Sequence, residues 1–67
     1  GERIREARVK LRISQSELAA RLQVKGVNIE RDSLSRIETG ARFVTDYEIL
    51  VLSEILNVNA LWLLGIE

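Results

Sequence analysis

Residues 14–22, SQSELAARL, have the pattern of a helix that begins at a defined residue and packs closely against a neighbour. Ser14 followed three residues later by Glu17 is a capping box, which predicts that the helix begins at Gln15. The alanines in its middle allow another helix to approach closely, and Gly26 provides a stop because glycine adopts a left-handed conformation easily. The helix is expected to bury two leucines one turn apart, Leu18 and Leu22.

The next patterned stretch, RDSLSRIETG (31–40), predicts a helix with two different faces. Leu34 and Ile37 are three residues apart, so both point to the same side and are expected in the core. Gly40 ends the helix. The opposite face and its flanks carry only polar side chains: Arg31, Asp32, Ser33, Ser35 and Arg36. Such a set is either ordinary solvated surface or a group of hydrogen-bonding side chains that meets a partner.

Three more helices are predicted, which gives five short helices and no strand. Residues 2–12 form the first. Thr45 with Glu48 is a second capping box and opens a helix over 46–56, and Asn59 caps a last short helix. The apolar stripes expected to be buried on these helices are Ile4, Ala7 and Leu11 on the first and Ile49, Leu52 and Leu56 on the fourth.

Length and composition limit the chain to one small all-α domain. It has 67 residues, 46% hydrophobic and 4% aromatic, without proline, cysteine or histidine. Without these ligands a zinc site is not expected, and no disulfide can form. The longest apolar runs, ILVL and ALWLL, are far shorter than the roughly 20 residues of a membrane span. We therefore expect no metal, no cofactor and no membrane partner. Because the chain begins without methionine, it fits a domain excised from a longer protein.

Charge is balanced overall but unevenly distributed. All ten Lys and Arg lie within residues 3–42 beside six acids, a net charge of +4, whereas residues 43–67 hold four acids and no base, a net charge of −4. One end of the domain can therefore face an anion while the other is occupied elsewhere.

The two central helices together suit double-stranded DNA. The major groove is about 12 Å wide and admits one α-helix, whose first turns reach the base edges. An arginine fork matches guanine O6 and N7, Asp accepts from cytosine N4, and Ser bonds to several edges. Gln15, at the start of the preceding helix, stands where an amide and backbone N–H groups can meet a phosphate.

The motifs SQSELAARL, LSRIETG and LSEILNVNALWLLG resemble the helix-turn-helix domain of the lambda-repressor and Cro type, in the xenobiotic-response-element family of bacterial and phage regulators. The resemblance covers nearly the whole chain. It implies a compact five-helix bundle whose second and third helices form the helix-turn-helix, over about residues 14–38. It also implies a cytoplasmic or nucleoid transcriptional regulator, most simply a repressor, that binds operator DNA as a two-fold homodimer.

The resemblance assigns roles to individual residues. Base-reading positions are Arg31, Asp32, Ser33 and Arg36, and phosphate-binding positions are Ser14, Gln15, Thr39 and Arg42. Arg8 and Glu38 match a partly buried structural salt bridge, and the helical pattern independently places Glu38 beside the inward face. Asp32 also has a simpler interpretation, because an acid in a first turn complements the helix dipole.

The sequence departs from the family pattern in the turn between the two central helices. QVKGVNI (23–29) is about five residues longer than the common form. The extension either lengthens the preceding helix or adds a loop with Val27 and Ile29 tucked beneath. It also brings Lys25 into consideration as a phosphate contact.

The fourth helix is more apolar than one buried stripe requires, which suggests self-association. The candidate dimer patch is Tyr47, Leu50, Val51 and Ile55. Trp62 is expected in the core.

The sequence is compatible with three classes of function: a sequence-specific DNA-binding regulator, a protein-interaction module of the same fold, and an enzyme. The enzyme is disfavoured because the chain lacks histidine, cysteine and a glycine-rich phosphate loop. An antitoxin or a controller protein is not distinguishable from a repressor at this level.

Overall fold

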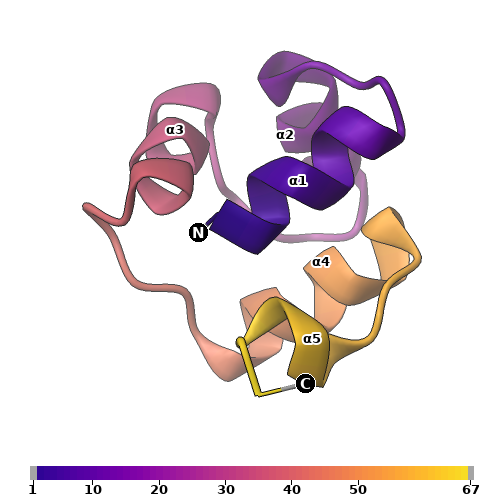
Figure 1. Ribbon diagram of the computed structural model, residues 1–67. Coiled ribbons are helices and arrows are strands. Elements are labelled where there is room, and N and C mark those ends of the chain that lie inside the picture. The colour runs from indigo at the N-terminus through magenta and orange to yellow at the C-terminus, as the bar shows by residue number, and fades with distance from the viewer. Residues whose placement is uncertain (1, 67) are drawn as a thin grey trace.

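The computed structural model describes residues 2–66 and contains five helices within them. They are α1 (Glu2–Lys10), α2 (Gln15–Val24), α3 (Arg31–Thr39), α4 (Asp46–Leu56) and α5 (Ala60–Leu63). In Figure 1, α2 and α3 lie side by side at the top, α1 crosses the middle, and α4 and α5 lie below. The expected all-α bundle of five helices is confirmed.

One hydrophobic core joins all five helices. Its fully buried members include Leu18 and Leu22 of α2 and Leu34 and Ile37 of α3, the residues that the helical pattern assigned to the interior. Ile49, Leu52 and Leu56 of α4 are buried as well. The pair α2–α3 is thus anchored from beneath by side chains that leave its outer surface polar.

The predicted caps are present at the helix starts. The Ser14 hydroxyl accepts from the Glu17 N–H at 3.0 Å, although the Glu17 carboxylate binds Arg21 at 3.2 Å rather than completing the box. Thr45 and Glu48 form both bonds of a capping box. Asn59 accepts from the backbone of the first turn of α5. Glu30 precedes α3 without a side-chain cap, as its residue type predicts.

All five helices end in the same way, with one left-handed residue followed by a residue whose N–H reaches back to the last turn. At the end of α3, for example, the Gly40 N–H bonds to Ile37 O at 3.1 Å and the Ala41 N–H bonds to Arg36 O at 2.8 Å. This pair of bonds is the Schellman motif. The left-handed residues are Arg12, Gly26, Gly40, Asn57 and Gly65.

This ending corrects the expected extent of the first helix. The helix stops at Lys10 because Arg12 adopts φ 59° and reverses the chain. Leu11, expected to be buried, is therefore 43% exposed, and Ile13 takes the place in the core. Helix α2 ends in the same way at Gly26, and the long turn to α3 follows. This turn is a loop with Val27 and Ile29 buried beneath, the second of the two arrangements expected.

A second correction concerns α4. Val51, assigned to a surface patch, is only 7% exposed and belongs to the core, and Ile55 is half-buried against it. The reason is that α4 packs against α1, α2 and α5 together, which buries a wider face than a helix with a single neighbour would bury.

Candidate nucleic-acid interface

The outer surface of α3 presents its charged side chains to solvent. Arg31, Asp32 and Arg36 are all exposed, and Ser33 and Ser35 are half-buried beside them. Within residues 2–66, none of the three charged groups forms an ion pair or a side-chain hydrogen bond. Asp32 and Arg36 are one turn apart, a spacing at which such pairs often form. These groups are therefore available for an external partner.

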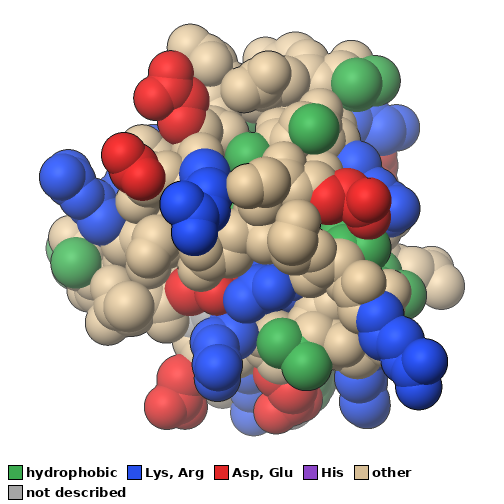
Figure 2. Space-filling model, turned by 90° about the horizontal axis from the view of Figure 1, so that it is seen from above, with side chains coloured by type: hydrophobic (Ala, Val, Ile, Leu, Met, Phe, Trp, Pro, Cys, Tyr) green, Lys and Arg blue, Asp and Glu red, His purple; other side chains and the backbone are tan. Residues whose placement is uncertain are grey.

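The α2–α3 side of the molecule is mainly polar. Seen from above, Figure 2 shows Lys and Arg side chains at several places on this side, with acidic groups between them and few hydrophobic side chains. Exposed large apolar side chains occur on α4 and at the C-terminal end, and also at Val9, Leu11, Val24 and Phe43.

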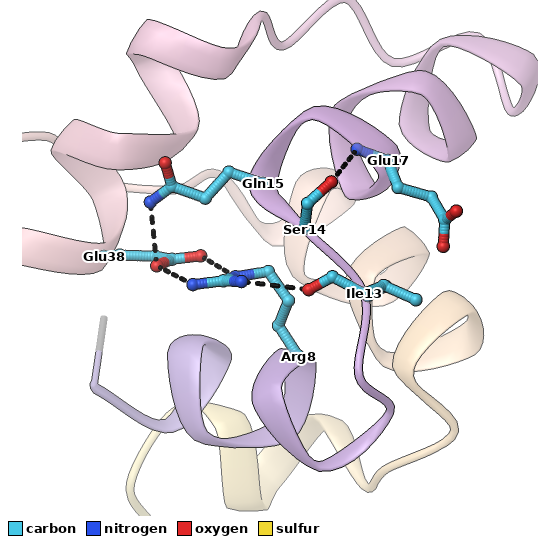
Figure 3. A network of polar contacts seen from close by, with 6 residues as sticks. All are labelled: Arg8, Ile13, Ser14, Gln15, Glu17 and Glu38. Carbon is cyan, nitrogen blue, oxygen red and sulfur yellow. Dashed lines mark hydrogen bonds and ion pairs between the residues drawn. The ribbon is translucent and has the colours of Figure 1, made fainter.

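A buried ion pair fixes α3 relative to α1 and α2. Arg8 Nε lies 2.7 Å from Glu38 Oε2 and Arg8 Nη2 donates to Glu38 Oε1 at 3.0 Å, a bidentate pair (Figure 3). Arg8 Nη1 also donates to the Ile13 carbonyl at 3.0 Å, and this hydrogen bond holds the turn between α1 and α2 against α1. The exposed fractions of the two side chains are only 12% and 2%. The hydrogen bonds to Glu38 raise the pKa of Arg8, burial opposes that shift, and the Glu38 charge adds to it.

Gln15 belongs to this network as well as to the surface. Its Nε2 donates to Glu38 Oε1 at 3.1 Å, and the side chain is half-buried. One of its two amide N–H donors is thus committed inside the protein, which orients the side chain. The network connects the first turn of α2 to the last turn of α3, so the start of α2 is held at a fixed position relative to the end of α3.

The predicted phosphate-binding residues are not all brought together. Ser14 caps α2, and Thr39, the last residue of α3, is exposed and donates its hydroxyl proton to Arg36 O at 3.2 Å. Lys25 is directed to α4, with its Nζ 3.9 Å from Glu54. Both side chains are more than half exposed, so this surface pair is weak and Lys25 remains a candidate phosphate contact.

Arg42 is held at the loop after α3 by an ion pair to the start of α4. Its Nη2 lies 3.2 Å from Glu48, and its Nη1 is buried without a hydrogen-bond partner among the described residues. Burial raises the pKa of Glu48, but the hydrogen bond from the Thr45 N–H and the Arg42 guanidinium outweigh it, so the net pKa lies below the ordinary value of 4.5. The same carboxylate thus caps α4 and positions Arg42.

Two exposed residues near this surface were not identified from the sequence. Arg12, in the turn before the cap of α2, is exposed and makes no ion pair in the described chain. Phe43, in the loop after α3, is 96% exposed. The position of Arg12 two residues before the capping Ser14 could have indicated that it lies near the start of α2. No local sequence pattern, however, predicts that a phenylalanine such as Phe43 will be exposed.

Only two of the four residues in the candidate dimer patch remain exposed. Of the candidate dimer patch, Tyr47 and Leu50 are 60% and 56% exposed, whereas Val51 and Ile55 contribute to the interior as described above. Trp62, expected in the core, is partly buried against it, and Arg3 lies over its ring at 5.1 Å. Further exposed apolar side chains occur on α5 and after it: Leu61, Leu64 and Ile66.

Fold and surface together define a small helix-turn-helix protein, and the comparison with protein families agrees. A family model described as a helix-turn-helix domain matches residues 1–65, so the chain belongs to the helix-turn-helix domain family. No curated protein and no solved structure matches the chain. In residues 2–66, no helix is long and apolar enough to cross a membrane, and no cluster of acidic side chains is arranged to hold a metal ion.

Proposed function

We propose that this protein is a sequence-specific double-stranded DNA-binding regulator that reads the major groove with α3. The observation that carries the proposal is the set of charged groups on the outer face of α3. Arg31, Asp32 and Arg36 are exposed and unpaired within residues 2–66 and lie on one helix beside α2. Arg5 and Arg12 are also exposed and unpaired in the described chain, but they lie on α1 and in the turn after it. Free guanidiniums on the first two turns of a helix suit guanine edges in the groove.

The residues around α3 would hold the helix in place on the sugar–phosphate backbone. Ser14 and Gln15 begin α2 on one flank, and Thr39 and Arg42 follow the reading surface on the other. The Arg42 guanidinium would bind a phosphate in addition to Glu48 or in place of it. Such contacts position the protein without reading sequence, and each neutralised phosphate adds about 0.9 to the salt dependence of binding.

The finer assignment follows the lambda-repressor and Cro resemblance. We propose a regulator of bacterial or phage type that occupies an operator as a two-fold homodimer in the cytoplasm or nucleoid, acting as a repressor and without a cofactor. The exposed apolar side chains of Tyr47 and Leu50 support a self-associating surface on α4. In a dimer of this kind, the two α3 helices meet half-sites about 34–36 Å apart.

Three arginine variants test this proposal by separating base reading from phosphate binding. Arg36→Ala is expected to lower discrimination at one base pair by about 1–3 kcal/mol. Arg42→Ala is expected to weaken selected and random duplexes alike and to reduce the salt slope by about 0.9. Arg5→Ala is the matched control, because Arg5 is exposed and unpaired on α1 within the described chain. Equal losses for Arg36→Ala and Arg5→Ala on selected and random duplexes would contradict the assignment.

A protein-interaction module of the same fold is the second candidate. Its support is the zero net charge together with exposed apolar residues at Leu50, Leu61 and Leu64. The two functions differ in one measurement, which is enrichment of particular sequences from a randomised duplex pool. Enrichment supports the DNA-binding proposal, and its absence at low salt supports the interaction module.

A further inference from the structure

Asp32 is an unusual group to find on a surface that approaches DNA. It is exposed in the first turn of α3 and has no ion-pair partner in the described chain. A carboxylate near phosphates is repelled by them, and a hydrogen bond that it accepts from a base can compensate for that repulsion. The major groove offers two kinds of donor, the amino groups of cytosine N4 and adenine N6.

The two donors are not equivalent for a carboxylate. Adenine presents its amino group beside the N7 acceptor, which repels a second carboxylate oxygen, whereas cytosine presents N4 as its only polar group in the groove. An acceptor-only side chain such as Asp32 therefore favours cytosine over adenine. An amide, which has one donor and one acceptor, favours adenine instead.

Arg36 lies close enough to act with Asp32 on the same part of a site. Residues four apart occupy one face of a helix and are separated by about 6 Å along its axis. Base pairs in DNA follow one another at about 3.4 Å. The long Arg36 side chain can cover that difference while the short Asp32 side chain stays near its own Cα, so the two reach neighbouring base pairs.

We propose that α3 selects a half-site with two neighbouring G·C pairs, in which Asp32 accepts from cytosine N4 and Arg36 forks onto guanine O6 and N7. The inference rests on the proposed DNA-binding function and names the bases it requires. In the bound state the two side chains lie beside each other, so the guanidinium charge offsets the repulsion between Asp32 and the phosphates. Because no ion pair joins Asp32 to Arg36 in the free protein, neither side chain has to be released first.

Selection from a randomised duplex pool with three proteins tests the inference. The wild-type domain is expected to enrich two neighbouring G·C pairs. Asp32→Asn is expected to exchange cytosine for adenine at one of them and to keep guanine at the other, with a change in preference of roughly 5- to 150-fold. Asp46→Asn is the matched control, because Asp46 is also an exposed first-turn acid but lies on α4. It should leave the selected sequence unchanged.

The outcomes separate this inference from the proposed function. Retention of cytosine by Asp32→Asn, or A·T pairs at the selected positions in the wild type, overturns the assignment of bases but leaves DNA binding intact. The same exchange in Asp46→Asn also overturns it, because the effect would then follow from lost charge alone. Absence of any enriched sequence with the wild-type domain removes both.

Discussion

Removing the Arg8 guanidinium should nearly unfold the domain. In Arg8→Met the buried Glu38 carboxylate, 2% exposed, would keep only the hydrogen bond from Gln15. Breaking a buried pair from one side typically costs about 3–5 kcal/mol, since it leaves an uncompensated charge. At roughly 0.05–0.15 kcal/mol per residue, a chain of 67 residues has about 3–10 kcal/mol of stability in total. The variant is therefore expected to be unfolded or marginally folded at 25 °C.

Urea denaturation followed by circular dichroism measures this loss, and two further variants interpret it. The double variant Arg8→Met/Glu38→Leu replaces both charges with apolar groups and should recover most of the stability. Arg21→Met is the control, because it breaks the exposed pair with Glu17 and should cost less than about 1 kcal/mol. A loss below about 1 kcal/mol for Arg8→Met, or a double variant no more stable than the single one, would refute the reasoning.

Four other outcomes are expected. Because the pKa of Glu48 is lowered in the folded state, its contribution to stability is present above the unfolded pKa and is lost as the pH falls through the folded pKa. When the pH is lowered from neutral to below about 4, the urea midpoint should therefore decrease less for Glu48→Gln than for the wild type. Gly40→Ala should cost about 1 kcal/mol in the same assay, since φ is 84° at this position although nothing lies in the way of a Cβ. Arg12→Gly should raise the free energy of unfolding by up to about 1 kcal/mol, and the urea midpoint with it, because glycine relieves the left-handed strain at φ 59°. An unchanged or lower urea midpoint would show that the arginine costs no stability at this position. Leu50→Lys should shift sedimentation equilibrium toward monomer if α4 carries the dimer surface; a wild-type protein that is monomeric at high concentration would remove that surface from the account.

The helix boundaries were largely predictable because they depend on short-range chemistry. Capping requires particular side chains one turn apart, so Thr45 with Glu48 locates the start of α4 without knowledge of the rest of the fold. The end of α1 was predicted two residues late because short-range patterns do not mark a left-handed arginine. Nothing in an arginine announces a left-handed conformation, so the reversal at Arg12 and the exposure of Leu11 were not visible in the sequence.

The parts of the candidate site that depend on contacts between distant residues could not be predicted from the sequence. The outward direction of Arg31, Asp32 and Arg36 followed from the inward positions of Leu34 and Ile37 on the same helix. The pairing of Lys25 with Glu54 joins residues far apart in sequence, and helical spacing cannot predict it. The burial of Val51 depends on how many helices surround α4, which also cannot be obtained from the periodicity of one helix.

Methylation interference on a selected duplex tests most directly whether the start of α3 enters the major groove. Methyl groups at guanine N7 occupy the major groove and those at adenine N3 occupy the minor groove. The account predicts that guanine N7 methylation blocks binding and that one such guanine ceases to matter in Arg36→Ala. Interference confined to adenine N3, or an identical guanine pattern in Arg36→Ala and the wild type, would contradict it.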